Sequence, residues 1–223
     1  MDEIYVFCDG ASKGNPGPGG WGSIILNDDI AIELGGYSPN TTNNQMELTA
    51  PIKALEELSY ARRKIVIFTD SKYVINGITS WIHNWKKNGW KTGAKENVLN
   101  ETYWRKLDAL TEDKVIEWKY VPGHSGITGN ERADEIASSF ASGKKIKLYN
   151  GSKNKYPHDI EIPNEIGDFK KIKPYYLSLS EGNLITHLTW SECKTYADGR
   201  GGVKYRKVNN IKEEEQIKKL WGL

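Results

Sequence analysis

The short apolar run over residues 64–69 constrains the fold of this chain most strongly. Its sequence, Lys-Ile-Val-Ile-Phe-Thr, is rich in β-branched residues and does not alternate between apolar and polar side chains. Such a run predicts a strand that is buried on both faces, and Asp70 ends it. Ser71 is suited to begin a helix, so the order of strand, helix and strand around this segment predicts an α/β sheet.

Flanking patterns extend this prediction over the first part of the chain. Asn43 is suited to cap a helix whose apolar positions recur at helical spacing, and Pro51 should kink that helix locally because proline cannot donate to the carbonyl of Glu47. The remaining expected elements are strands at residues 3–8, 21–26, 30–37 and 115–121 and helices at 101–110 and 130–141.

Composition limits the class of protein. The chain has 223 residues with 38% hydrophobic and 27% charged residues, it has no apolar run near the length of a membrane span, and its N-terminus lacks signal-peptide features. We therefore expect a soluble cytoplasmic protein. Cys8 and Cys193 form no zinc pattern and are expected to be reduced structural thiols.

Charge is distributed unevenly along the chain. Residues 1–142 carry 15 lysines and arginines against 19 acids, a net charge of −4, while residues 143–223 carry 16 against 10, a net charge of +6. An acidic body with a basic tail favours a cation site in the first part and contact with a polyanion in the second. A tail that is merely solvated is the alternative.

A segment rich in tryptophan and lysine follows the apolar strand. Aromatic faces interleaved with ammonium groups suit a nucleic-acid groove, whereas a helical core stripe with a solvated face is the simpler alternative. The residues concerned are Trp81, Trp85, Trp90 and Trp104 together with Lys86, Lys87, Lys91 and Lys95.

Four acids occupy comparable places in the predicted sheet. Asp9 and Asp70 end strands that should be neighbours, Glu47 lies early in a helix, and Asp134 lies in the helix after the last strand. Each acid alone would more often be a cap or turn residue. Together they would form an all-oxygen ligand set, which selects hard ions such as Mg²⁺ or Mn²⁺. Two such ions can activate water and stabilise the leaving oxygen of a phosphodiester.

Five motifs in residues 1–142 resemble those of type-one ribonuclease H, in the family's order and spacing. They are Phe7-Cys8-Asp9-Gly10-Ala11-Ser12 with Gly14-Asn15-Pro16-Gly17, Thr41-Thr42-Asn43-Asn44-Gln45-Met46-Glu47-Leu48, Thr69-Asp70-Ser71-Lys72-Tyr73-Val74, the segment from Trp81 to Lys91, and Gly123-His124-Ser125-Gly126 with Gly129-Asn130-Glu131-Arg132-Ala133-Asp134.

The resemblance implies an endoribonuclease that hydrolyses the RNA strand of RNA–DNA hybrids and leaves 5′-phosphate and 3′-hydroxyl ends. It implies two Mg²⁺ ions, with Mn²⁺ as a substitute, on Asp9, Glu47, Asp70 and Asp134, and a proton-handling role for His124. It assigns Asn15, Asn43, Asn44 and Gln45 to the RNA strand, Thr42, Trp81, Trp85 and Asn100 to the DNA strand, and Lys86, Lys87 and Lys91 to a basic protrusion. The resemblance places a DNA-strand phosphate pocket at Thr42 and Asn100, and Asn40 stands where some relatives carry arginine, which would weaken that pocket.

Residues 143–173 show no clear periodicity and are expected to form a flexible linker. Residues 174–223 then predict a small domain with strands at 175–180, 184–188 and 203–208, a helix after Thr189 and a helix at 211–221. This part resembles the hybrid-binding, viroplasmin-like module, which usually precedes the catalytic domain. The resemblance implies nucleic-acid contacts by Tyr176, Trp190, Tyr205, Arg206 and Lys207. A protein-contact or spacer domain is the alternative.

The expected architecture is a ribonuclease H-like mixed five-stranded sheet flanked by helices, plus a small α+β domain of three strands and two helices. The expected partners are an RNA–DNA hybrid and, through the C-terminal domain, double-stranded RNA, with no membrane and a monomeric state. A catalytically silent hybrid-binding protein is the alternative from another class. A DNA nuclease or integrase-like enzyme on the same fold is a third hypothesis, which the asparagine-rich motif disfavours.

Overall fold

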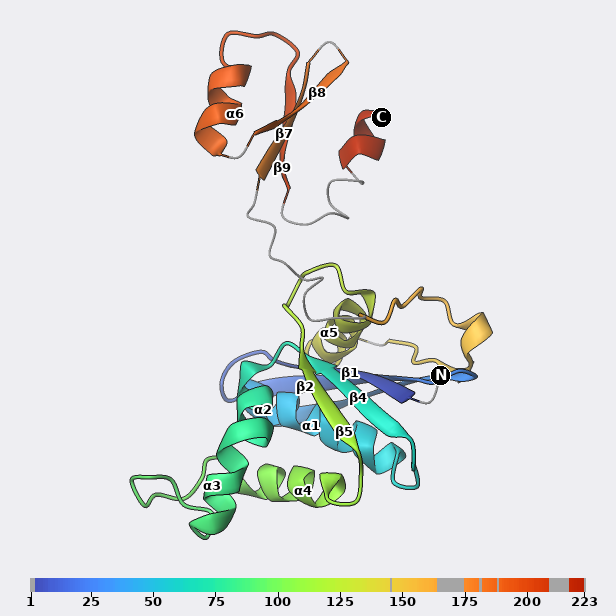
Figure 1. Cartoon of the computed structure of the whole chain (residues 1–223), viewed down its shortest axis with the longest axis vertical. Helices are drawn as coiled ribbons and strands as arrows, with labels where there is room; N and C mark the ends of the chain where they lie inside the picture. Colours follow the sequence, from blue (N-terminus) through green and yellow to red (C-terminus); the bar gives the residue numbers. More distant parts are fainter. Residues whose placement is uncertain are drawn as a thin grey trace. The chain divides into compact units, whose positions relative to one another are not determined.

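The computed structural model describes residues 3–144, 146–163, 175–180, 182–187, 189–208 and 217–222. The chain divides into two compact units, Met1–Ile166 and Gly167–Leu223, each with its own sheet (Figure 1). No helix in the described residues is both long and apolar enough to cross a membrane.

The first unit is built on a mixed sheet with the strand order β5-β4-β1-β2-β3-β6. β1 pairs in parallel with β4, and β4 in parallel with β5, while the pairs β1–β2, β2–β3 and β3–β6 are antiparallel. This confirms the predicted α/β class, with a sixth strand added at one edge. The strands are β1 (Glu3–Ser12), β2 (Gly17–Leu26), β3 (Ile30–Thr41), β4 (Lys64–Thr69), β5 (Ile116–Tyr120) and β6 (Asn150–Ser152).

Helices cover both faces of this sheet, which explains why β1 and β4 are almost continuously apolar (Figure 1). Val6 and Cys8 point into the core shared with α1 and α4, whereas Phe7 faces α5 and stacks on Phe68 with ring centroids 4.7 Å apart. The helical segments are α1 (Asn43–Glu57), α2 (Lys72–Asn76), the π-helical turn η1 (Gly77–Trp81), α3 (Ile82–Lys87), α4 (Glu101–Thr111), α5 (Thr128–Ala141) and the 3₁₀ turn η2 (Lys153–Lys155).

The start of α1 differs by one residue from the prediction. Thr42, rather than Asn43, is the N-cap, and its hydroxyl accepts a hydrogen bond from the backbone of Gln45 at 3.3 Å. The Gln45 side chain in turn accepts from the Thr42 backbone at 3.1 Å, which completes a capping box. The helix continues through Pro51 to Glu57.

The prediction of a flexible linker from residue 143 is wrong for residues 146–163, which we call the strap. β6 in the strap pairs with the edge strand β3, and Tyr149 and Tyr156 pack ring against ring at 5.1 Å. The strap closes over Glu33, whose carboxylate is fully buried. The sequence signal was weak because one buried carboxylate organises the strap and no apolar periodicity marks it.

Hydrogen bonds and an ion pair satisfy the buried Glu33 carboxylate completely. Arg132 on α5 pairs with it through Nε at 2.7 Å and Nη2 at 2.9 Å. From the strap, the Tyr156 hydroxyl donates at 2.7 Å and the Tyr149 backbone at 3.0 Å. Burial tends to raise the pKa of Glu33, but these donors outweigh it, so the pKa lies below its ordinary value. The strap is therefore part of the first unit.

The second unit has a three-stranded antiparallel sheet in the order β8-β7-β9. Leu177 and Val208 form a small core with Ile217, which lies in a helical segment at residues 217–221. The rest of the helix expected at 211–221 lies outside the described residues. The elements are β7 (Tyr175–Ser180), β8 (Asn183–His187), α6 (Trp190–Ala197) and β9 (Lys204–Val208).

Candidate active site

The first unit gathers the four acids around Asp9. The parallel ladder of β1 and β4 ends at the pair Cys8 and Thr69, so Asp9 and Asp70 are the next residues on adjacent chains. β1 itself runs on to Ser12 against β2, so Asp9 lies inside this strand rather than at its end. Glu47 enters from α1, which passes so close to β1 that a Cβ at Gly10 would lie 2.2 Å from the Glu47 nitrogen.

Electrostatic coupling joins these carboxylates. Burial, as the largest cause, and the negative charges of Asp70, Asp134 and Glu47 together raise the pKa of Asp9 to about 8, against the lowering effect of the Gly10 backbone N–H. The pKa of Glu47 is also raised, first by burial and then by Asp70. None of the four acids forms an ion pair with lysine or arginine within the described residues.

Polar neighbours donate hydrogen bonds to three of the four carboxylates. Glu47 accepts hydrogen bonds from the Ser71 hydroxyl and from Asn43 Nδ2, the latter at 2.8 Å. Asn130 Nδ2 donates to Asp70 at 3.2 Å, and Ser138 donates to Asp134 at 3.1 Å.

As they stand, no three acidic, histidine or cysteine side chains in the described segments are close enough to hold a metal ion.

The chemistry of the donor set nevertheless fits a divalent cation. It consists of hard carboxylate oxygens, and its concentrated negative charge lacks a protein counter-charge. Asn130 adds a second sign, because its Oδ1 atom is buried beside Asp70 and is the one buried side-chain oxygen or nitrogen without a partner in the described residues. The site is therefore short of positive charge and of hydrogen-bond donors.

His124 lies on an exposed loop that reaches the same site. Its φ angle of 51° is in the left-handed region, and the Ser125 hydroxyl closes the loop by donating to the Pro122 carbonyl at 2.6 Å. A Cβ at Gly123 would lie 2.7 Å from Asp70 Oδ2, so the loop approaches Asp70 with bare backbone. The glycine thus brings the histidine loop next to the carboxylates.

The asparagine-rich motif forms a polar rim at the start of α1. Asn15 Oδ1 accepts from the Asn43 backbone at 3.3 Å, which ties the β1–β2 turn to this helix. Gln45 is engaged inside the protein: it takes part in the capping box with Thr42, and its amide donates to Asn100 at 3.3 Å. The resemblance assigns Gln45 to the RNA strand of the hybrid and Asn100 to the DNA strand, and these two side chains are thus neighbours.

The tryptophan and lysine segment has features of both alternatives, a buried core stripe and an exposed aromatic surface. Trp104 is fully buried, whereas Trp81 is 39% exposed. Tyr73, Trp81, Trp85 and Trp104 form a cluster with ring centroids 5.3 to 6.1 Å apart. The core of this cluster is structural and its rim is available for contact.

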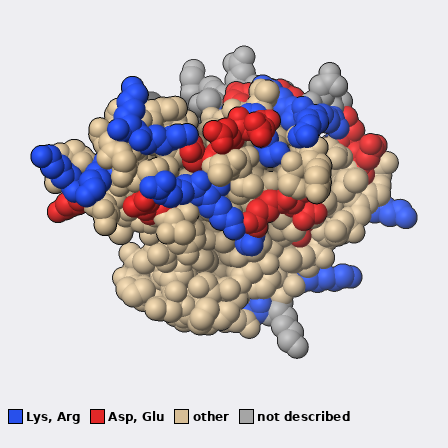
Figure 2. All heavy atoms as spheres, turned by 90° about the horizontal axis from the view of Figure 1, so that it is seen from below, with Lys and Arg blue, Asp and Glu red and all other residues tan. Residues whose placement is uncertain are grey.

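The lysines of the segment differ in their partners. Lys86 is paired with Asp108 at 2.7 Å, while Lys87 and Lys91 are exposed and make no ion pair within the described chain. Figure 2 views the side on which α3 and α4 lie in Figure 1 and shows basic and acidic side chains alternating over one half of it. This half is therefore not uniformly basic.

Three residues support the site in ways that the sequence did not predict, although Ser71 was expected to begin a helix. Ser71 both caps α2 and holds Glu47, and Asn130 holds Asp70. The Tyr73 hydroxyl accepts from Asn100 Nδ2 and from Trp104 Nε1, each at 3.1 Å. All three lie inside the motifs quoted above, and this was the only sign of their roles in the sequence. Their hydrogen-bond partners are determined by the folded chain.

Comparison with known proteins agrees with this geometry. The RNase H family model matches residues 1–142. The chain belongs to the ribonuclease H family. The ribonuclease H of Alcanivorax borkumensis is 53% identical over 138 residues, which cover 62% of this chain and 91% of the relative. The ribonuclease H of Thermosynechococcus vestitus is 51% identical over 146 residues, which cover 64% and 91%.

A solved structure extends the likeness to the fold. The crystal structure of LC9-RNase H1, described as a type 1 RNase H with the type 2 active-site motif, matches with a TM-score of 0.59 and 29% identity over 67% of this chain and 77% of that one. The chain is therefore an enzyme of the ribonuclease H family. Members of this family generally use divalent metal ions.

The second unit lies outside the ribonuclease H match and carries a group of aromatic rings on one face of its sheet. Trp190 lies 5.4 Å from the ring of Tyr176 and 5.5 Å from that of Tyr205, and it is 44% exposed. Lys207 pairs with Tyr176 across the sheet and so shares its face. We call Tyr176, Trp190, Tyr205 and Lys207 the ring surface.

Arg206 is separated from this ring surface by strand alternation. It pairs with the buried Leu177, and successive side chains of a strand point to opposite faces of the sheet. The five residues that the sequence placed together therefore lie on two faces, four on one and Arg206 on the other.

Proposed function

We propose that this ribonuclease H hydrolyses the RNA strand of RNA–DNA hybrids and leaves 5′-phosphate and 3′-hydroxyl ends. The observation that carries the proposal is the group of four coupled carboxylates, Asp9, Glu47, Asp70 and Asp134, which lacks a cationic partner in the described chain. Membership of the ribonuclease H family supports the substrate class. A silent hybrid-binding protein is not favoured, because all four acids are present.

These four acids would hold two divalent cations, for which we propose Mg²⁺ with Mn²⁺ as a substitute. Bound there, the cations would supply an activated water and stabilise the leaving oxygen of the phosphodiester. Ser71 positions Glu47 through a hydrogen bond, and Asn130 does the same for Asp70. His124, on the loop that touches Asp70, is suited to move a proton to or from the reacting oxygens, because an imidazole ring carries nitrogens that can both donate and accept.

The polar rim and the aromatic cluster would hold the two strands of the hybrid. Asn15 contacts the backbone of Asn43, and Asn43 contacts Glu47, so together with Asn44 these amides would face the 2′-hydroxyls, which distinguish RNA from DNA. Gln45 would act mainly by positioning Asn100, since its side chain is engaged within the protein. The DNA strand would contact Thr42, Asn100, Trp81 and Trp85, and the free Lys87 and Lys91 would meet its phosphates, with Lys86 already paired.

A substrate panel with a matched variant tests the catalytic proposal. The wild type should cleave labelled RNA–DNA hybrid in Mg²⁺, should leave single-stranded RNA and duplex DNA intact, and should stop when a chelator is added. Asp70→Asn should abolish cleavage while hybrid binding persists. Asp113→Asn, which changes an exposed acid away from the site, should behave as wild type. Full activity of Asp70→Asn would refute the metal assignment.

We further propose that the second unit binds the backbone of a hybrid or of double-stranded RNA through the ring surface. Exposed aromatic rings beside a lysine suit a polyanion, and tethering would raise the local concentration of substrate. Deleting residues 167–223 should weaken hybrid binding and leave the strap in place. Trp190→Ala should reproduce most of that loss and Arg206→Ala much less; equal losses would argue against the ring surface.

A further inference from the structure

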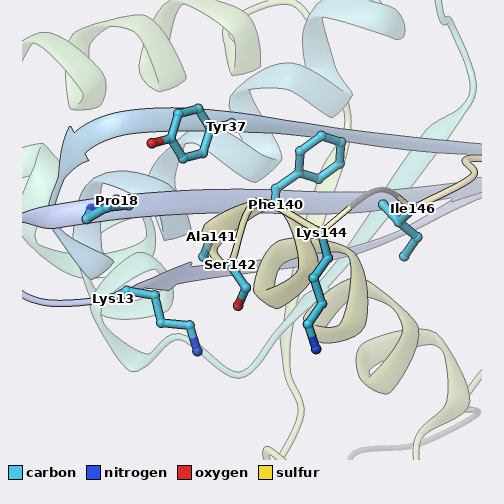
Figure 3. A pocket seen from close by; sticks show the side chains of 9 residues that line it. Lys13, Pro18, Tyr37, Phe140, Ala141, Ser142, Lys144 and Ile146 are labelled. Atoms are coloured by element: carbon cyan, nitrogen blue, oxygen red, sulfur yellow. The ribbon is translucent and has the colours of Figure 1, made fainter.

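An open pocket lies where α5 ends, at the turn between β1 and β2. It has a volume of about 850 Å³, and Figure 3 shows Tyr37 and Phe140 over the sheet with Lys13 and Lys144 on either side of Ser142. Lys13, Pro18, Tyr37, Phe140, Ala141, Ser142, Gly143, Lys144 and Ile146 line it. The proposed catalytic chemistry uses none of these residues.

Glycines in the sheet create the floor of this pocket. A Cβ at Gly20 would lie 2.6 Å from the Phe140 Cβ, and one at Gly35 would lie 2.5 Å from the Phe140 Cε2. The aromatic ring can lie against β2 and β3 only because these side chains are absent. Gly143, with a φ of 67°, then ends α5 and turns Lys144 along the rim.

The lining is apolar at the floor and basic at the rim. Tyr37 is 53% exposed, and Phe140 is partly buried. The two lysine side chains extend in the same direction (Figure 3), and neither has an ion pair within the described residues. None of the described residues that line the pocket is acidic. Aromatic faces beside unpaired ammonium groups fit a nucleobase and its phosphates.

The pocket continues the proposed RNA-binding rim. Lys13 lies two residues before Asn15, whose side chain contacts the start of α1. Ser12, the last residue of β1, is three positions beyond Asp9 in the same strand, a distance of about 10 Å at 3.3 Å per residue. At about 3.4 Å of axis rise per nucleotide, the pocket begins a few nucleotides from the carboxylates.

We propose that this pocket binds an unpaired nucleotide of the RNA strand where that strand leaves the hybrid. The base would stack on Tyr37 and Phe140, and its phosphates would meet Lys13 and Lys144. Bases inside a duplex already stack on their neighbours, so only an unpaired base offers a free face. The inference rests on the proposed function, because Asn15 identifies the RNA side. The enzyme would thereby favour hybrids that continue into single-stranded RNA.

Binding of full-length wild type to three substrates, in chelator to prevent cleavage, tests this proposal. The substrates are a blunt hybrid, the same hybrid with a four-nucleotide RNA overhang at either end, and one with a DNA overhang. An RNA overhang at one end should tighten binding about tenfold, within the range found for stacking residues. Tyr37→Ala and Lys144→Gln should each remove most of this gain and leave blunt-hybrid affinity unchanged.

Matched controls are available on the same chain. Tyr60→Ala changes a tyrosine that is 90% exposed elsewhere, and Lys147→Gln changes an exposed lysine of the strap; both should retain the gain. No gain with either RNA overhang, an equal Tyr37-dependent gain with DNA, or a gain that survives both pocket variants would each overturn the inference. Cleavage of the blunt hybrid in Mg²⁺ is scored separately, and its absence would overturn the proposed function instead.

Discussion

The strap offers the sharpest quantitative prediction, because two neighbouring tyrosines on it differ mainly in what their hydroxyls bind. Tyr156 donates to the fully buried Glu33 carboxylate at 2.7 Å, and burial together with this bond raises its pKa, so it stays protonated as a donor. Tyr149 donates to the Ser152 carbonyl at 2.6 Å in an exposed setting. Replacing each by phenylalanine removes one hydroxyl and keeps the ring.

The expected losses follow from the charge of the acceptor. Hydrogen bonds to charged groups contribute about 1.5–3 kcal/mol, so Tyr156→Phe should destabilise the docked strap by about 2 kcal/mol. A neutral exposed bond contributes about 0.5–1 kcal/mol, which is the expectation for Tyr149→Phe. At 1.36 kcal/mol per factor of ten, local opening should become about 30-fold more frequent in the first variant and roughly 2- to 5-fold in the second.

Native-state hydrogen exchange measures this opening directly. The reporters are the backbone amide of Glu33, which donates to the Tyr149 carbonyl at 2.7 Å, and the amide of Tyr149, which donates to the Glu33 carboxylate. Hybrid cleavage should be unchanged, since neither tyrosine contacts the carboxylate site. Equal loss of protection in the two variants, or none in Tyr156→Phe, would refute the idea that the buried carboxylate anchors the strap.

Three further outcomes are expected. Because the folded pKa of Glu33 is depressed, strap docking should be fully stable above the ordinary glutamate range and should weaken as pH falls below it, as limited proteolysis would detect. Tyr73→Phe should lower hybrid affinity several-fold in titrations by releasing Asn100. Gly20→Ala should cost about 1–3 kcal/mol in denaturant melts, since its Cβ would lie 2.3 Å from an α5 carbonyl, whereas Gly93→Ala meets open space and should be neutral.

Much of the sheet and of the candidate site was predictable because the signals are local. The apolar run before Asp70 indicated a doubly covered strand, and β4 occupies residues 64–69 as predicted. The sequence also predicted that Asp70 ends this strand and that Ser71 begins the helix after it. The motifs placed the acids in family order, and the RNase H match over residues 1–142 confirms the family they indicated.

The strap was mispredicted because it depends on a distant partner, and the ring surface likewise arises from contacts between separate elements. The strap looks like a linker in sequence, since its anchor is Glu33 more than a hundred residues earlier. Strand alternation alone puts Tyr205 and Lys207 on one face of β9 and Arg206 on the other, whereas only the register of β7 and β9 brings Tyr176 to the face of Lys207. A string of aromatic and basic residues carries no register information by itself.

The sequence alone thus determined the α/β class, the order of the motifs and the four acids, because each depends on short-range pattern. Only the tertiary structure decided how these acids meet. Folding brings Asp9 beside Asp70 through the parallel pairing of β1 and β4, and it turns Glu47 toward Ser71. The mutual repulsion and burial that raise the pKa of Asp9 arise from this assembly, since separated carboxylates on an open chain remain hydrated and ionised.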